Sequence, residues 1–126
     1  MTRAERDGIR RAIAAAEEGT TGRIAVRVIP DGAVEAFERA KAEFGRVGLH
    51  RHGARNGALI LVAPKARRFA IVGDAALHER VGDEFWNGVV RDATPYFAGG
   101  RNADAIVFAV GRIGDALHAH FASATT

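Results

Sequence analysis

The residue best suited to chemistry in this chain is Asp74, which directly follows the apolar segment 69–73. An aspartate at the edge of a sheet offers an anionic oxygen, which can hold a divalent cation or accept a phosphoryl group. Asp is also a favoured N-cap, so Asp74 could instead cap a helical turn that follows it. His78 lies four residues later and is the histidine placed to act as a general acid near Asp74.

Several common mechanisms are excluded by residues that the chain lacks. There is no cysteine, which removes disulfides, thiolate metal sites and a thiol nucleophile. The only serine, Ser123, lies near the end of the chain, so a Ser-His-Asp triad is not available. Neither a Walker-type loop nor a G-x-G-x-x-G motif occurs. Phosphatase chemistry would therefore need a metal-bound water or an aspartate, with Arg55 holding the phosphate.

The remaining histidines are weaker candidates for a site. His50 and His52 lie in a glycine-rich loop, where we expect exposure to solvent. His118 and His120 are two residues apart in a helical pattern, so they point to different sides and cannot hold one ion together.

Length and composition predict one soluble globular domain. The 126 residues are enough for one core but not for two, and 48% of them are hydrophobic and 26% charged. We expect a single domain over residues 1–121 and a disordered tail over residues 122–126, which are small and polar. No apolar run resembles a signal peptide or approaches the ~20 residues of a membrane span, so we expect a cytoplasmic protein.

The charge balance favours no nucleic-acid partner. Lys and Arg number 18 against 15 Asp and Glu, which gives a formal net charge of +3. Nucleic-acid sites usually concentrate their basic residues and interleave them with aromatic side chains, whereas the cations here are dispersed along the chain.

Two apolar runs on either side of residues 64–67 predict a β-hairpin. Residues 58–63 and 69–72 are apolar on both faces, as expected of strands that are covered by helices on either side. With Lys65 and Ala66 at the tip, the expected cross-strand pairs are Leu61 with Ala70, Leu59 with Val72, and Gly57 with Asp74.

The rest of the chain shows mainly helical periodicity. A capping box at Thr2 and Glu5 predicts a helix over about residues 3–18, and a strand follows at residues 24–29. Asp31 is expected to cap a second helix with Glu43 on its outer face and the following buried stripe: Val34, Phe37, Ala40, Phe44 and Val47. A helical turn at 75–80 breaks at Gly82. Asp83 then caps a helix that Pro95 kinks or ends, and a last helix covers residues 102–121.

The element order α-β-α-β-β-α-α predicts an α/β/α sandwich, with a small mixed sheet and helices on both faces. A crossover through the second helix makes the first two strands parallel. Polar residues from three places then lie at one sheet edge: Thr20, Thr21, Arg55, Asn56 and Asp74. The helical segment with His78 and Asp83 must begin at the same edge.

Motifs along almost the whole chain resemble the TPM domain family, which is described as phosphatase-like, and in particular its small soluble bacterial members. The matching segments are 20–22, 44, 48–49, 55–59, 68–74, 85–86, 95–97, 113–117 and 120–121. The resemblance implies a Rossmann-like sandwich. It also implies binding of Ca²⁺ or Mg²⁺ as in some members, and acid phosphatase activity is attributed to some members only.

The site that the resemblance implies lies at the edge that the topology indicates. The expected roles are ligand binding by Thr21, Arg55 and Asn56, metal binding by Asp74 and Asp83, and catalysis by Asp74 and His78. Structural alternatives are a helix cap for Asp83 and a turn-closing amide for Asn56. Ala76 replaces a glycine of the family, and arginines stand at positions 23 and 101 where relatives carry acidic residues or Gln. Arginine opposes a divalent ion and favours an anion such as phosphate.

Two functions follow as hypotheses. In the first, the domain binds a divalent cation or a small phosphorylated ligand at this edge, with weak or lost phosphatase activity. In the second, it is a non-catalytic adaptor for a membrane-associated or envelope protein partner. A third possibility places the ligand at the opposite sheet edge, near Asp31 and residues 65–68, where parallel strands usually present ligands. The sequence makes no prediction of oligomeric state.

Overall fold

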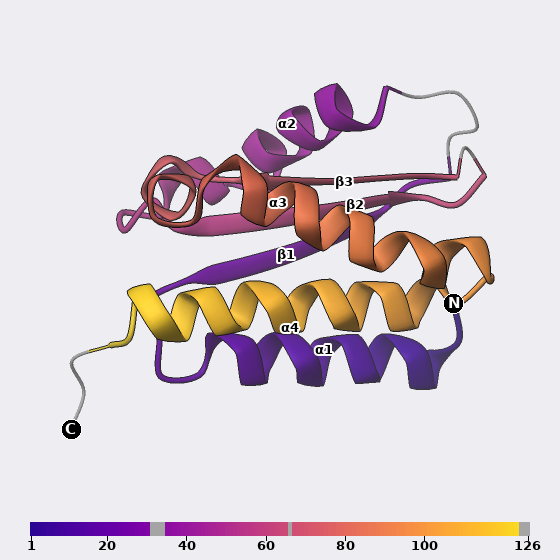
Figure 1. Ribbon diagram of the computed structural model, residues 1–126, viewed down its shortest axis with the longest axis horizontal. Helices are drawn as coiled ribbons and strands as arrows, with labels where there is room; N and C mark the ends of the chain where they lie inside the picture. The colour runs from indigo at the N-terminus through magenta and orange to yellow at the C-terminus, as the bar shows by residue number, and fades with distance from the viewer. Residues whose placement is uncertain (31–34, 66, 124–126) are drawn as a thin grey trace.

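The structure, a computed structural model, describes residues 1–30, 35–65 and 67–123. Its elements are α1 (Arg3–Glu17), β1 (Arg23–Val28), α2 (Ala36–Arg46), the short 3₁₀ helix η1 (Leu49–Arg51), β2 (Gly57–Ala63), β3 (Arg68–Gly73), α3 (Ala75–Ala98) and α4 (Asn102–His120). Figure 1 shows the strands as a central layer with helices on both sides. The predicted α/β sandwich and the predicted order of its elements are confirmed.

The central strand of the sheet is β2, which runs parallel to β1 and antiparallel to β3. The crossover through α2 therefore joins two parallel strands, as predicted. The predicted hairpin register is also confirmed, because Leu59 pairs with Val72 and the Asp74 N–H donates to the Gly57 carbonyl at 2.8 Å. Ala66, expected at the hairpin tip, lies outside the described residues.

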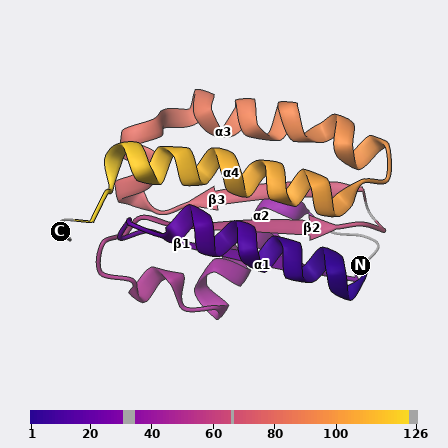
Figure 2. The same cartoon turned by 90° about the horizontal axis from the view of Figure 1, so that it is seen from below.

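Two apolar cores lie on the two faces of the sheet. On one face α1, α3 and α4 lie side by side (Figure 2), and their apolar residues pack against Ile24, Ile60 and Ile71. On the other face α2 packs against Leu59 and Leu61. All seven residues of β2 are buried, which explains why this strand is apolar without alternation.

The buried face of α2 differs from the predicted stripe. Ala40 and Phe44 are buried as predicted, but Phe37 is 50% exposed and Val47 is also exposed. Phe37 lines a groove at the free edge of β3 instead of the core. The helix begins at Ala36, and the Glu35 carboxylate caps it by accepting the Glu38 N–H at 2.7 Å. The predicted cap Asp31 and the stripe residue Val34 lie outside the described residues.

Glu43, predicted to lie on the outer face of α2, is fully buried. Its Oε1 accepts a hydrogen bond from Arg27 Nε of β1 at 3.0 Å, and Arg46 Nε lies 3.3 Å from its Oε2. The prediction is wrong because the Arg27 side chain of β1 lies on the same face of the sheet as α2 and reaches Glu43. A buried carboxylate there is compensated by arginines whose own side chains reach solvent.

The predicted break at Gly82 is confirmed, because α3 consists of two helical segments that meet at a kink at this residue. Gly82 has φ 75°, a left-handed conformation that glycine adopts without steric cost. Asp74 caps α3 by accepting the Ala75 N–H at 2.7 Å. Pro95 lies inside the helix, which continues to Ala98.

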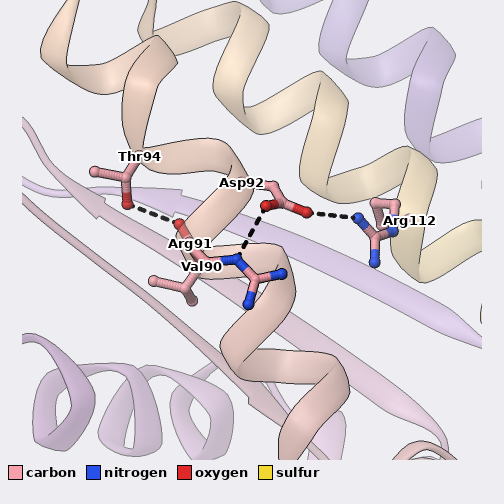
Figure 3. A network of polar contacts seen from close by, with 5 residues as sticks. All are labelled: Val90, Arg91, Asp92, Thr94 and Arg112. Carbon is pink, nitrogen blue, oxygen red and sulfur yellow. Dashed lines mark hydrogen bonds and ion pairs between the residues drawn. The ribbon is translucent and has the colours of Figure 1, made fainter.

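Polar contacts join α3 to α4 on their outer side (Figure 3). The Asp92 carboxylate accepts hydrogen bonds at 3.2 Å from Arg91 of the same helix and from Arg112 of α4. These two arginines lower the pKa of Asp92, with the bond from Arg91 as the larger cause. Two residues after Asp92, the Thr94 hydroxyl donates to the Val90 carbonyl at 2.7 Å.

The end of the described chain is held against the loop after α1. Thr20 and Ala122 form an isolated β-bridge, and the Ser123 N–H donates to the Gly19 carbonyl at 2.8 Å. Ala122 and Ser123, which were expected to belong to a disordered tail, are therefore bonded to the domain. Residues 124–126 of that tail lie outside the described residues. Among the helices of the described ranges, none has both the length and the apolar character needed to cross a membrane.

Candidate functional site

An ion pair between Arg55 and Asp74 lies at the sheet edge that the topology indicates. Arg55 Nε donates to Asp74 Oδ2 at 2.8 Å, and Arg55 Nη2 donates to Oδ1 at 2.9 Å. The Ala75 N–H also donates to Oδ1, at 2.7 Å. The two side chains are unequally exposed, 55% for Arg55 and 6% for Asp74. The carboxylate is therefore enclosed, while the guanidinium reaches solvent.

Backbone contacts hold this pair in place. Arg55 has φ 55°, in the left-handed region that non-glycine residues seldom adopt. Its carbonyl accepts the Ala76 N–H at 2.9 Å, and the Asp74 N–H donates to the Gly57 carbonyl at 2.8 Å. Backbone bonds from Arg55 and from Gly57 thus join the start of β2 to the junction of β3 and α3, which fixes the direction of the Arg55 side chain.

The two charges stabilise each other. The hydrogen bond from Arg55 is the main cause of a lowered pKa for Asp74, and the Ala75 N–H and the nearby His50 lower it further. Burial acts in the opposite direction on Asp74 but does not prevail. The hydrogen bond to Asp74 raises the pKa of Arg55. Both groups are therefore charged at neutral pH.

Asn56 connects the starts of β1 and β2. It is fully buried, and its Nδ2 donates to the Thr21 hydroxyl at 2.9 Å. Its Oδ1 is buried and accepts no hydrogen bond from the described residues. His52 Nε2 donates to the Thr21 carbonyl at 2.8 Å, because a carbonyl oxygen can only accept. Thr21 is therefore held from two sides.

The structure brings four of the predicted site residues together and places the other two apart from them. Thr21, Arg55, Asn56 and Asp74 line the predicted edge. His78 and Asp83 form a separate cluster on α3. His78 Nδ1 accepts a hydrogen bond from Trp86 Nε1 at 3.1 Å, and His78 Nε2 lies 3.5 Å from Asp83 Oδ1. Asp83 is 88% exposed there.

The sequence analysis did not assign two neighbouring histidines to the site. His50 is exposed, as expected, but it lowers the pKa of Asp74, and the half-buried His52 bonds to Thr21. Their position three to six residues before Arg55 and Asn56 was the available signal. A segment that leads into the first residues of β2 must pass this edge, and η1 turns it back toward β1.

The donor set does not fit a divalent cation. Both oxygens of Asp74 already accept hydrogen bonds, and the Arg55 charge beside them opposes a second cation. Asp83 faces His78 instead of Asp74. Within residues 1–30, 35–65 and 67–123, no group of three or more His, Asp or Glu side chains could hold a metal ion. Instead, the site exposes the guanidinium of Arg55 to solvent.

The opposite end of the sheet has a smaller cavity of about 450 Å³, lined by Pro64, Arg67, Arg68 and Phe97 among others. It matches the alternative ligand position near residues 65–68. Asp31, the acidic residue proposed for that position, lies outside the described residues. The described part of this cavity has basic and apolar walls.

Comparison with known families gives a match over most of the chain. The sequence profile of the TPM domain matches residues 1–116. No curated protein matches the chain.

Solved structures share the fold. The NMR structure of BA42 protein from the psychrophilic bacterium Bizionia argentinensis is 30% identical, with a TM-score of 0.87 over 97% of this chain and 84% of that one. The N-terminal domain of a protein from P. gingivalis is 17% identical, with a TM-score of 0.81 over 99% of this chain and 83% of that one. The N-terminal domain of cg2496 protein from Corynebacterium glutamicum is 14% identical, with a TM-score of 0.75 over 100% and 80%.

Proposed function

The chain belongs to the TPM domain family, and we propose that it binds a phosphate-bearing ligand through Arg55 at the sheet edge formed with Thr21, Asn56 and Asp74. Binding there needs no hydrolysis. The enclosed Asp74 carboxylate orients the guanidinium and takes no part as a nucleophile, because its oxygens are engaged by Arg55 and Ala75.

The observation that carries this proposal is the unequal exposure of the ion pair, 55% for Arg55 against 6% for Asp74. A guanidinium has five N–H donors, and Arg55 uses Nε and one hydrogen of Nη2 on Asp74. Its Nη1 donates to none of the described residues and remains for a ligand. Planar arginine donors match phosphate oxygens and can bind them in pairs.

The surroundings of Arg55 also favour an anion over a cation. Ala75 and Ala76 begin α3 beside the pair, and the first turn of a helix carries a partial positive charge. His50 is close enough to act on Asp74 and adds positive charge whenever it is protonated. Arg23 stands at the start of β1, next to Gly57 in the register of the sheet.

The test is a titration of ¹⁵N-labelled chain with inorganic phosphate, and separately with Ca²⁺ and with Mg²⁺. We expect phosphate to shift the Arg55 Nε–H and the amides of Thr21 and Ala75. Arg55→Gln should abolish these shifts, whereas Arg51→Gln, which removes the same charge from an exposed residue of η1, should retain them. Shifts around Asp74 with Ca²⁺ or Mg²⁺ and none with phosphate would assign the site to a cation and overturn the proposal.

A second candidate function is a non-catalytic interaction domain for a protein partner. The groove beside β3 favours it, because Phe37 lies half exposed there on an otherwise well-packed helix. Metal-dependent hydrolysis of a phosphomonoester that Asp74→Ala abolishes would exclude this candidate. It would also exclude phosphate binding without hydrolysis.

A further inference from the structure

β3 is an edge strand whose outer side has no partner among the described residues. It pairs with β2 only. The Asp74 N–H bonds to the Gly57 carbonyl, and backbone groups in an antiparallel ladder alternate between inward and outward directions. The N–H and C=O groups of Phe69, Ile71 and Gly73 therefore point away from β2, toward the open edge.

A groove of about 840 Å³ runs along this edge between α2 and α3. Its floor is β3, and its walls include Phe37 of α2 and Trp86 of α3. Natural sheets protect their edges with charges, prolines or bulges, and none of these occurs in the strand after Arg68. The edge is thus open to pairing with another strand.

The two ends of the groove carry opposite charge. At the start of β3 lie Lys65, Arg67 and Arg68, which we call the basic end; all three are exposed. At the other end Asp83 of α3 lines the groove, and Glu79 and Glu84 lie close to it in sequence; we call these three exposed residues the acidic end. Asp83 lies one turn before Trp86, whose ring packs against Gly73, the last residue of β3. Figure 1 shows α3 beginning where β3 finishes, at the far side from the hairpin tip.

We propose that β3 pairs antiparallel with β3 of a second copy of this chain, about a two-fold axis at Ile71. Such an axis requires a self-complementary surface, and an antiparallel pair places the basic end of each copy against the acidic end of the other. It also sets Phe69 of one copy opposite Gly73 of the other, an aromatic residue across from a residue without a side chain. The outward N–H and C=O groups of Ile71 bond to their symmetry mates. This surface adjoins the Arg55 site at Asp74, which directly follows β3, but the pairing does not depend on a ligand at Arg55.

The charge pattern favours a second copy over an unrelated peptide, since both halves of the complementarity are present on this chain. The test is sedimentation equilibrium, which measures the average mass of the chain in solution from micromolar to millimolar concentration. The wild-type chain should reach twice the 13.4 kDa mass of one chain as concentration rises. Arg68→Glu alone and Asp83→Arg alone should each raise the dimer dissociation constant roughly tenfold or more, because like charges then meet twice.

An equimolar mixture of the two variants restores opposite charges at both contacts, so it should form a heterodimer at wild-type strength. Recovery in the mixture also shows that each variant is folded. Amide exchange of Phe69, Ile71 and Gly73 should slow with concentration in the wild type. The proposal is overturned if the chain stays monomeric throughout, even where a foreign extended peptide protects the same amides. It is equally overturned if a dimer forms that neither charge reversal weakens.

Discussion

Arg55 and Asp74 are 19 residues apart in sequence and form a two-bond ion pair in which only the arginine is open to solvent. The pair joins Arg55, two residues before β2, to Asp74, the N-cap of α3. It therefore has two separable consequences, one for stability and one for binding. The stability consequence follows directly from the lowered pKa of Asp74.

Replacing Asp74 by Asn should change how stability depends on pH. A carboxyl whose pKa is lower in the folded chain stabilises it above the unfolded pKa of about 3.9, and this contribution is lost as pH falls through the folded pKa. At neutral pH we expect Asp74→Asn to cost about 1–2 kcal/mol, reduced by solvent screening of the half-exposed Arg55. Below about pH 4 the difference from wild type should shrink. Urea unfolding at a series of pH values measures both quantities.

Asp115→Asn is the matched control, because Asp115 is an exposed aspartate of α4 and the chemical change is the same. It should leave the pH dependence of the unfolding free energy as in the wild type. A parallel loss for both variants at every pH would show that Asp74 contributes nothing specific.

Thr21 should matter through its hydroxyl, which accepts the hydrogen bond of the buried Asn56 amide. Thr21→Val keeps the shape but removes the acceptor, so a buried donor is left without a partner. We expect a loss of about 1–2 kcal/mol in the free energy of unfolding. Thr21→Ser keeps the hydroxyl and should lose less than half of that. Equal losses in the two variants would contradict the assigned role of the hydrogen bond.

The sequence predicted this edge because strand order and chain direction are encoded locally. The apolar runs at 58–63 and 69–72 fix the hairpin, and the crossover rule then fixes β1 beside β2. Chain direction alone brings Thr21, Asn56 and Asp74 to one end of the sheet. What it could not give was the left-handed turn at Arg55, which depends on the Ala76 and Asp74 backbone bonds.

The misplacement of Glu43 has a different physical origin. Helical periodicity assigns a face from the average polarity of a stripe, and a single glutamate at its border is assigned to water by default. The compensating Arg27 comes from another element, 16 residues earlier. No local sequence pattern reveals such a pair. Phe37 was assigned to the core for another reason, because helical periodicity does not show where the sheet beneath the helix ends.

The buried Glu43 leads to an asymmetric prediction. Its carboxylate is 1% exposed, while the Arg27 side chain is 47% exposed. Removing Arg27 leaves a buried charge with weaker compensation, so Arg27→Met should cost about 1–2 kcal/mol. Removing the carboxylate leaves arginines that water can solvate, so Glu43→Met should be neutral or stabilising.

Thermal and denaturant unfolding of the two single variants and the double variant measure the interaction between Arg27 and Glu43 as a double-mutant cycle. In the Glu43→Met background, Arg27→Met should have almost no effect, because the charge that it compensates is gone. Glu38→Met on the exposed side of the same helix controls for the added methionine. If Glu43→Met proves the more damaging single change, the carboxylate is a net source of stability and the expected order is reversed.

Two glycines of α4 that are three residues apart should respond to alanine with opposite sign. A Cβ at Gly114 would lie 2.7 Å from the Ala16 Cβ of α1, whereas a Cβ at Gly111 would have no neighbour within 4 Å. Both positions are helical, so propensity favours alanine equally at each, by about 0.5–1 kcal/mol. At Gly114 the helices must move apart, which costs about 1–3 kcal/mol in overpacking. We therefore expect Gly114→Ala to lower the melting temperature and Gly111→Ala to raise it.

Adding Ala16→Gly to Gly114→Ala should recover part of the loss, because it removes the atom that the new methyl group meets. Stabilisation by Gly114→Ala would mean that α1 and α4 do not approach as closely as this packing requires.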